Sequence, residues 1–367
     1  MTVKIQNSFT FTNGLTMPNR VVLAPITLAV SKAGGYVSEE DIAFYKRRSA
    51  AVGMAITGSA YIDPSGQAFP NSFSVAEDDK IQGLKQVAQA IQSQGALAIL
   101  QIYHGGRMVP PQMTETDPIA PSSIRALRGT VSQPRALEYK EIEEVLALFI
   151  KAIERAIEAG FDGVELHGAN TYLIQQFFSP HSNRRKDKWG GTLNNRMRFA
   201  KSLVKKAKQL LKEKSDRPFL IGYRLSPEEI EEPGITLSDT LQLVEQLIHL
   251  QIDYLHLSMD NVWQSSLRDK SQKEPLIWAL KKKIKGRVPL IAVGKIKSVA
   301  DAQKVLDEGI PLFALGQSLL LEPDWTQKVL AGQEDQIIRA YRDDLHDQVG
   351  LPDAFIDEFR DFLEGKY

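Results

Sequence analysis

Polar side chains able to form hydrogen bonds stand at the ends of short apolar runs in this sequence. The run Gly163–His167 leads into the pattern His-x-x-Asn-x-Tyr, made of His167, Asn170 and Tyr172. Other runs end at or near the polar residues Thr27, Ser59, Gln101 and Arg224. These groups donate and accept hydrogen bonds, and few carboxylates accompany them. A lone histidine is more often a packed core residue, but this mixture suits a flat, polar, heteroaromatic ligand better than a metal ion.

Glycines follow two further runs near the end of the chain. The sequences are Val293-Gly294-Lys295 and Leu315-Gly316-Gln317, and each precedes the start of a predicted helix. Backbone N–H groups at glycine can approach an anion closely, and the last two βα loops of a barrel commonly bind phosphate. We expect a phosphate group at this corner, with tight turns as the alternative reason for the glycines.

Composition removes several kinds of site and partner. The chain has no cysteine, which excludes disulfides, Fe–S clusters, thiolate zinc sites and cysteine nucleophiles. Its 45 basic residues balance 45 acidic ones, so no overall positive field favours nucleic acid or an anionic membrane. No apolar run approaches the roughly 20 residues that span a bilayer. The start MTVKIQNSFTFTNG lacks the pattern of a signal peptide, so we expect a cytoplasmic protein with a small-molecule partner.

The elements that must position these residues alternate along the chain. Eight runs typical of strands buried on both faces are Arg20–Pro25, Met54–Ser59, Ala96–Ile102, Gly163–His167, Phe219–Arg224, Tyr254–Leu257, Leu290–Val293 and Leu312–Leu315. Segments with 3.6-residue periodicity predict helices at Glu39–Ala51, Asp78–Ser93, Tyr139–Ala159, Leu193–Lys214, Ser238–Leu250, Glu274–Ile284, Ser298–Asp307 and Pro323–Leu330. Local signals support several boundaries, with caps at Ser38, Ser238 and Ser298 and stops at Gly95, Gly160 and Gly309.

Eight alternating units favour one fold class, a single (β/α)8 TIM barrel. A doubly wound open sheet is the alternative, but it would more often carry the dinucleotide pattern G-x-G-x-x-G, which this chain lacks. Residues 104–136 and 179–195 predict long loops at the C-terminal face, where such loops usually cover a site. No linker divides the chain, so we predict a single domain over residues 1–367. Its tail, about residues 341–367, either closes the barrel or contacts a neighbour, which leaves a homo-oligomer open.

With these residues in place, the sequence resembles the Old Yellow Enzyme family, the FMN-dependent ene-reductases and related NADH:flavin oxidoreductases. The resemblance covers nearly the whole chain. It depends on the order and spacing of Pro18–Pro25, Gln101 with His104–Arg107, His167–Tyr172, Gln176–Pro180, Trp189–Leu193 with Asn195 and Arg196, Arg224 and the two glycine loops. It implies a barrel that binds FMN non-covalently. NADH or NADPH would reduce the flavin and leave, and an electron-poor acceptor such as an activated alkene would then take the hydride.

The resemblance implies that the isoalloxazine ring is surrounded by Pro25, Thr27, Ala60, Gln101 and Arg224. A hydroxyl from Thr27 can donate to the flavin C4 carbonyl oxygen, and the Gln101 amide can pair with the pyrimidine edge. Arg224 would place permanent positive charge beside N1 and the C2 oxygen, which favours reduction. The alternatives are a turn residue for Thr27, a satisfied core amide for Gln101 and a buried ion pair for Arg224.

The resemblance also implies roles for the residues after the fourth strand. His167 and Asn170 are similar to the pair that hydrogen-bonds a carbonyl, nitro or phenolate oxygen of a ligand stacked on the flavin. Two donors aimed at that oxygen lower the barrier to hydride transfer as an oxyanion hole does. Tyr172 matches the phenol that delivers a proton to the face opposite the hydride. Glu165 shares the His167 face by two-residue alternation, and it either supports that face or forms an ion pair inside the barrel.

Two positions depart from the pattern of the family. Neutral Gln317 follows the last glycine, where the family commonly has an arginine that grips the FMN phosphate. Lys295 on the neighbouring loop can restore the missing charge, beside the backbone of Gly294 and Gly316. Lys295→Ala should then weaken FMN retention. Thr171 replaces a glycine often found between the asparagine and the tyrosine, and we expect this change to shift Tyr172 slightly.

Two other functions stay open from the sequence. Lys295, at a strand end, would form a Schiff base in a lyase or aldolase barrel. The chain would otherwise be a flavin-binding protein without turnover. A yellow purified protein argues against the first function, and consumption of NADH or NADPH argues against the second. The sequence does not choose between NADH and NADPH, and it does not name the acceptor.

Overall fold

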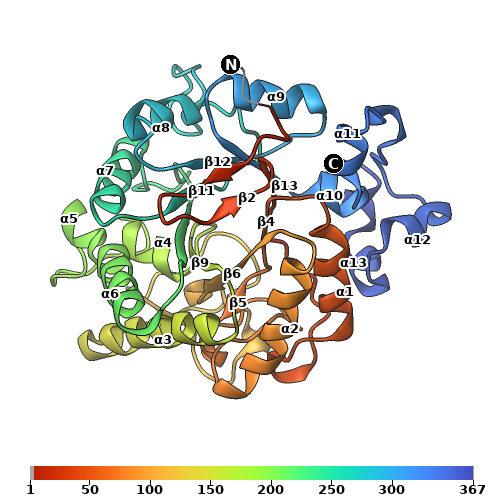
Figure 1. Cartoon of the computed structure of the whole chain (residues 1–367). Coiled ribbons are helices and arrows are strands. Elements are labelled where there is room, and N and C mark those ends of the chain that lie inside the picture. Colours follow the sequence, from red (N-terminus) through yellow and green to blue (C-terminus); the bar gives the residue numbers. More distant parts are fainter. Residues whose placement is uncertain (1–3, 367) are drawn as a thin grey trace.

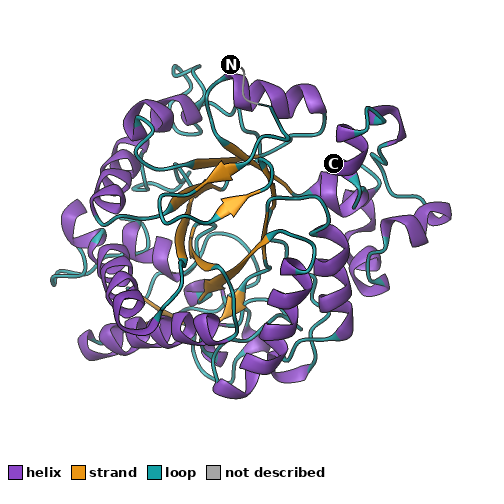
Figure 2. Cartoon of the chain, viewed as in Figure 1, coloured by secondary structure: helices purple, strands orange, loops and turns teal. Residues whose placement is uncertain are grey.

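Eight parallel strands close into a barrel in the computed structural model, which describes residues 4–366; Met1–Val3 and Tyr367, the ends of the predicted domain, lie outside the described residues. The barrel strands are β3 (Val21–Leu23), β4 (Met54–Ile56), β6 (Leu97–Tyr103), β9 (Gly163–Gly168), β10 (Leu220–Leu225), β11 (Tyr254–Leu257), β12 (Leu290–Val293) and β13 (Leu312–Leu315). Closure comes from β4, which pairs with both β3 and β6 (Figures 1 and 2). Every predicted strand corresponds to one of these eight, so the predicted TIM barrel is confirmed.

Helices form the outer ring of the barrel (Figure 2). They are α1 (Glu39–Arg48), α2 (Ile81–Gln92), α3 (Tyr139–Glu158), α6 (Arg198–Lys214), α7 (Leu237–His249), α8 (Leu276–Ile284), α9 (Val299–Asp307), α10 (Gln317–Leu321) and α11 (Trp325–Leu330). The helix predicted at 193–214 is wrong as one element, because α5 (Leu193–Arg196) precedes α6 across Met197. The helix predicted from Asp78 begins with a 3-10 turn, Asp78–Lys80, ahead of α2.

The predicted helix caps are correct at two of three positions. Ser38 and Ser298 each accept a hydrogen bond from the backbone N–H three residues later and form a capping box. The cap predicted at Ser238 is wrong, because Thr236 forms the capping box with Asp239 and α7 begins one residue earlier than predicted. Gly95, Gly160 and Gly309 follow their helices with positive φ, as expected for glycine at such a stop.

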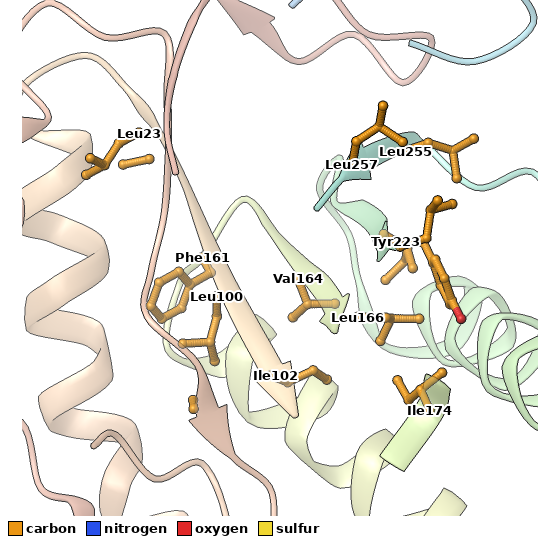
Figure 3. Packing of buried hydrophobic residues seen from close by; sticks show 14 of the residues in the cluster. Leu23, Leu100, Ile102, Phe161, Val164, Leu166, Ile174, Tyr223, Leu255 and Leu257 are labelled. Atoms are coloured by element: carbon orange, nitrogen blue, oxygen red, sulfur yellow. The ribbon is translucent and has the colours of Figure 1, made fainter. Parts of the chain in front are cut away.

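Side chains on the strands alternate between the barrel interior and the surrounding helices. Outward-pointing residues form the layer under the helices, and Figure 3 shows Leu100, Ile102, Val164 and Leu166 in it. The inward residues of the lower half of the barrel are apolar: Val22, Met54, Ile56, Leu97, Ile99, Leu220, Tyr254, Ile291 and Leu312. Gly222 is required among them, because a Cβ there would overlap the ring of Tyr254. The lower barrel is therefore a packed core that supports whatever lies above it.

The two ends of the chain pack on different parts of the barrel. The hairpin of β1 (Phe9–Thr10) and β2 (Thr16–Met17) crosses the near end of the barrel in Figure 1. Its neighbour Phe11 joins the apolar interior with Met17. The tail carries α12 (His346–Val349) and α13 (Asp353–Leu363). Arg48 of α1 anchors it by donating to the carbonyl oxygens of Val349 (2.6 Å) and Gly350 (3.2 Å). The tail thus packs against the chain's own barrel.

The loop 104–136 carries the short strands β7 (Ile119–Ala120) and β8 (Arg135–Ala136), which pair in parallel. Arg185 of the second long loop donates to the carbonyl oxygens of Pro121 (3.0 Å) and Leu137 (2.5 Å) and binds Asp187. The charged run of the second loop therefore joins the two loops together at this face. Within residues 4–366, no helix combines the length and apolar character needed to cross a membrane.

Candidate active site

The barrel interior changes from apolar to polar at the C-terminal ends of four neighbouring strands. Strand register places Gln101 of β6 beside Glu165 of β9. It also places Arg224 of β10 beside both His167 of β9 and His256 of β11. Polar residues from β6, β9, β10 and β11 thus form a continuous layer above the apolar core. Gln101, His167 and Arg224 were predicted to lie together, and the structure brings them together.

A chain of hydrogen bonds runs through this layer. The hydroxyl of Ser59 donates to Oε1 of Gln101 (2.5 Å), and Nε2 of Gln101 donates to Oε1 of Glu165 (2.7 Å). Nδ1 of His256 lies 2.9 Å from Oε2 of Glu165. Each of these side chains is at most 5% exposed. The amide of Gln101 is therefore fixed in orientation, and it still has a second N–H and a second lone pair with which to pair a ligand.

Charge in the layer is shared between one carboxylate and one guanidinium. Burial alone would raise the pKa of Glu165, but His256, Arg224 and the Gln101 hydrogen bond together hold it below its ordinary value. Burial lowers the pKa of Arg224 and Glu165 opposes that change, so both groups are charged at neutral pH. Among the described residues, Nε of Arg224 is buried and has no hydrogen-bond partner. A buried donor of this kind is suited to an acceptor atom on a ligand.

His167 and Asn170 both present N–H groups rather than acceptors. Nδ1 of His167 accepts from the backbone N–H of Ala169 (3.4 Å). Burial first, and then the charge of Arg224, holds the pKa of His167 well below its ordinary value, so the ring is neutral with its proton on Nε2. Oδ1 of Asn170 accepts from the hydroxyl of Ser258 (2.8 Å), which leaves its Nδ2 to donate. The pair can therefore bind one oxygen atom of a ligand.

The turn after β9 is strained and firmly held. Asn170 has φ of 56° and Thr171 has φ of 65°, the left-handed region where a β-branched residue is disfavoured. The N–H of Asn170 donates to Ser226 Oγ (3.2 Å), and the N–H of Thr171 donates to Gln175 Oε1 (3.0 Å). Nε2 of Gln176 donates to the carbonyl oxygen of Thr171 (2.6 Å). This explains the glycine preference at position 171, and the hydrogen bonds offset a strain of about 1–3 kcal/mol per residue.

Tyr172 stands against the edge of His167. Their ring centroids lie 4.9 Å apart in an edge-to-face arrangement, and the ring of Tyr103 lies 5.2 Å from that of Tyr172 and 6.5 Å from that of His167. Burial raises the pKa of Tyr172 to about 12. The phenol therefore keeps its proton at neutral pH and can act as a general acid.

Pro25, Thr27 and Ala60 lie at the ends of the first two barrel strands. Pro25 and Thr27 follow β3 and are half-buried. Thr27 Oγ1 accepts from the N–H of Ser59 (3.3 Å), so its own hydrogen is directed elsewhere. Ala60 is fully buried in β5 (Ala60–Tyr61), which pairs with β6 beside Gln101. These residues lie at the same C-terminal end as the polar layer.

The corner after β12 contains Gly294 and Lys295. Gly294 has φ of 117°, and a Cβ there would lie 2.7 Å from the carbonyl oxygen of Met259, so the turn itself requires glycine. Nζ of Lys295 forms an ion pair with Asp260 (2.8 Å), and the two side chains are 56% and 76% exposed. The structure therefore pairs Lys295 with a carboxylate at the surface. An exposed, paired ammonium does not favour a Schiff-base lysine, which needs a desolvated amine.

The corner after β13 contains Gly316 and Gln317. A Cβ at Gly316 would come no closer than 3.9 Å to any neighbouring side chain, so packing does not require glycine there. Such open space beside the backbone fits the approach of a phosphate. Nε2 of Gln317 donates to the carbonyl oxygen of Phe362 (2.9 Å), and this ties α10 to the tail. Part of the hydrogen-bonding capacity of Gln317 is thus used by the protein.

A cavity of about 310 Å³ opens beside Asn170, between the loops that follow β10 and β11. Arg128 of the long loop 104–136 reaches its wall and donates to the carbonyl oxygen of Asn170 (3.2 Å) and to Thr171 Oγ1 (3.1 Å). Ser226 and Ser258 line the same cavity. The long loop therefore supports the turn that carries Asn170, and the cavity opens on this residue.

Sequence reasoning missed His256, Ser226 and Ser258. His256 had a usable signal, because a polar residue at the end of a buried strand is the same signal that identified Gln101 and Arg224. The two serines had no signal of their own, since their partners are more than 50 residues away in the chain.

Residues 5–336 match a family described as the NADH:flavin oxidoreductase / NADH oxidase family. The chain is 44% identical over 330 residues to the probable NADH-dependent flavin oxidoreductase YqiG of Bacillus subtilis (strain 168), covering 90% of this chain and 88% of that protein. It is also 44% identical over 335 residues to the NADH:fumarate oxidoreductase of Klebsiella pneumoniae (strain 342), covering 90% of this chain but only 36% of that longer protein. Among solved structures, an Old Yellow Enzyme homologue from Zymomonas mobilis superimposes with a TM-score of 0.78 at 26% identity, covering 90% of this chain and 93% of that one.

Proposed function

Since the chain belongs to the NADH:flavin oxidoreductase / NADH oxidase family, with FMN as cofactor and NADH or NADPH as reductant, we propose that it reduces electron-poor acceptors such as activated alkenes. The observation that carries this proposal is the pair of N–H donors presented by His167 and Asn170. Their acceptor atoms are already occupied by protein donors, so the pair is directed at an oxygen of a ligand. The residues around them fit FMN, because Gln101, Thr27 and Arg224 offer hydrogen bonds and positive charge to its pyrimidine edge.

The donor pair has a direct catalytic consequence. Bound FMN supplies hydride acceptance from the nicotinamide and hydride donation to the acceptor at the same face. His167 and Asn170 hold the carbonyl oxygen of an α,β-unsaturated acceptor and stabilise the negative charge that develops on it. Donors that strengthen their bonds in the transition state contribute about 3–4 kcal/mol each in comparable oxyanion sites.

Tyr172 completes the proposed reaction. Its proton is retained at neutral pH, and its ring is held against His167. We assign to it the proton that reaches the α-carbon as the alkene is reduced. Neither His167 nor Tyr172 changes its charge near neutral pH, so the rate of alkene reduction should vary little between about pH 6 and pH 9.

The names of the relatives are consistent with this class of acceptor. One relative is an NADH:fumarate oxidoreductase, and an NADH:acrylate oxidoreductase of Vibrio harveyi is 42% identical over 331 residues. Fumarate and acrylate are both alkenes conjugated to a carboxylate. The chain spans about a third of the length of those two proteins, so their names refer to the activities of longer proteins and not of the matching part alone.

An anaerobic titration tests the proposed function. NADH or NADPH should bleach the visible absorbance of bound FMN, and an α,β-unsaturated ketone added afterwards should restore it. His167→Ala alone should slow the second step by about 10²- to 10³-fold, because one of the two donors to the developing oxyanion is lost. A protein that holds FMN but is bleached by neither nicotinamide would instead be a flavin-binding protein without turnover. Trapping of a carbonyl compound on Lys295 by borohydride, in a colourless protein, would establish the Schiff-base alternative.

A further inference from the structure

Glu165 and His256 form a buried pair to which the proposed reaction assigns no role. Both side chains are 0% exposed, and Nδ1 of His256 lies 2.9 Å from Oε2 of Glu165. The two residues belong to β9 and β11, which are separated by β10. Gly222 of β10 stands opposite Glu165 in the register and has no side chain. The ring of Tyr254 on β11 occupies the space beside Gly222, and Glu165 meets His256 across the intervening strand.

Stability alone does not account for this pair. A buried carboxylate has a desolvation cost of several kcal/mol, and well-packed apolar residues commonly stabilise a core at least as well. The neighbouring inward positions of the barrel show that solution, with Ile99 and Leu220 in register with Gly163, two residues before Glu165. The presence of the buried Glu165 carboxylate is therefore better explained by the groups that it contacts toward the C-terminal end of the barrel.

The groups above Glu165 are the ones that face the flavin. Its Oε1 accepts from Nε2 of Gln101 (2.7 Å), while Ser59 donates to the other atom of the same amide (2.5 Å). Glu165 and Ser59 thus determine which way the amide points. A reversed amide would set its carbonyl oxygen against the carboxylate of Glu165, two acceptors with no proton between them, so the presented edge is unique.

Glu165 also bears on the charge beside the flavin. Burial lowers the pKa of His256, more than Glu165 raises it, so the imidazole is neutral and donates from Nδ1. The other titratable groups near Glu165 are Arg224, His167 and Tyr254, of which His167 and Tyr254 are neutral. The negative charge of Glu165 therefore partly neutralises the positive charge of Arg224.

We propose that Glu165, held in place by His256, is a positioning residue for the flavin. It fixes the amide of Gln101 against the pyrimidine edge and offsets part of the charge of Arg224. It thereby sets both the affinity of the protein for FMN and the reduction potential of the bound flavin. The inference depends on the proposed function only through FMN binding, and both properties are measured without a nicotinamide or an acceptor.

The reduction potential of the bound flavin tests the effect of the negative charge on Glu165. Glu165→Gln keeps the shape of the side chain and removes the negative charge, so Arg224 acts on the flavin undiminished. The ratio of reduced to oxidised flavin at a fixed potential should rise about tenfold, which corresponds to an upward shift of about 30 mV for a two-electron couple. The matched control is Glu245→Gln, which removes a carboxylate from α7 at the surface, where it pairs with Arg287 and Lys283. This control should leave the potential unchanged.

The affinity for FMN tests the effect of position. Glu165→Asp keeps the charge but is one methylene shorter, so it no longer reaches Gln101 at hydrogen-bond distance. The dissociation constant of FMN should rise by about tenfold while the potential stays near that of the wild type, since each lost charged hydrogen bond has a value of about 1.5 kcal/mol. If Glu165 served only in packing, one variant would not change the reduction potential while the other changed the dissociation constant of FMN.

Two results would overturn the inference. One is a folded Glu165→Gln protein that binds FMN with the potential of the wild type. The other, decisive if Glu165→Gln does not fold, is an FMN dissociation constant in Glu165→Asp equal to that of the wild type. If the two variants show these effects while the wild-type protein consumes no NADH or NADPH, the proposed function is contradicted and this inference stands.

Discussion

The two ends of the proposed FMN site are built on opposite principles. At the ring end, Gln101, Glu165 and His256 come from barrel strands, are at most 1% exposed and bond to one another. At the phosphate end, the candidate residues stand on loops. Lys295 is 56% exposed and pairs with Asp260, and Gln317 donates to the carbonyl oxygen of Phe362 in the tail.

This difference has a physical origin. Most polar groups inside a barrel are hydrogen-bonded whether or not a ligand is present, because an unsatisfied buried group costs about 1–3 kcal/mol. Their partners therefore fix them in one arrangement. Exposed groups on loops are satisfied by water or by any nearby charge, so their contacts with a ligand compete with other contacts. The ring end should respond strongly to single substitutions, and the phosphate end weakly.

The largest effect is expected for Arg224→Met at the ring end. The substitution keeps most of the apolar length of the side chain but removes the guanidinium whose charge helps to lower the pKa of the buried Glu165 carboxylate. Leaving a buried charge without a compensating charge costs about 3–5 kcal/mol. The free energy of unfolding, measured by urea titration of the FMN-free protein, should fall by that amount.

Arg287→Met is the matched control for this prediction. Arg287 pairs with the carboxylate of Glu245 at the surface, where such pairs contribute about 0–1 kcal/mol. Equal losses in the two variants would show that the ring end is no more constrained than the surface and would contradict the comparison drawn above.

Tyr172→Phe should have the next largest effect, and it should be confined to one half-reaction. The phenol is held by His167 and Tyr103, so its removal leaves the donor pair in place. Reduction of an activated alkene should slow by about 10²-fold, the lower range for loss of a general acid, while bleaching of FMN by the nicotinamide keeps its rate. Rapid-mixing absorbance measurements separate the two steps. Equal slowing of both would indicate that Tyr172 shapes the site rather than supplying a proton.

The contrast between the two ends also explains how far sequence reasoning reaches. The barrel was predictable because each strand is buried on both faces and is therefore an uninterrupted apolar run, as in Leu312–Leu315. The ring end was predictable for the same reason, since a polar residue such as Gln101 or Arg224 is conspicuous at the end of such a run. The position of such a residue in its strand predicts whether its side chain points into the barrel and how close it lies to the C-terminal end.

Pairings between distant residues were not predictable. Glu165 meets His256, 91 residues later, across an intervening strand, and the sequence left open whether Glu165 forms an ion pair or supports the site. The cap at Thr236 was missed because Ser238 offers the same chemistry two residues later. At the phosphate end, the pairing of Lys295 with Asp260 depends on how two loops meet, which periodicity does not determine.

The smallest effect, and the one that most sharpens the comparison, is expected at the phosphate end. If Lys295 binds the FMN phosphate, Asp260 competes with the phosphate for the same ammonium across 2.8 Å. Lys295→Ala should then raise the dissociation constant of FMN by about fivefold, and Asp260→Asn should lower it by about threefold, as expected for exposed charges of at most about 1 kcal/mol. Both changes should shrink in high salt, because exposed charges are screened beyond about 10 Å at 0.1 M. Fluorescence titration of the FMN-free protein measures each constant. Changes of the same sign in the two variants, or none in either, would mean that Lys295 forms only a surface ion pair and that backbone N–H groups alone hold the phosphate.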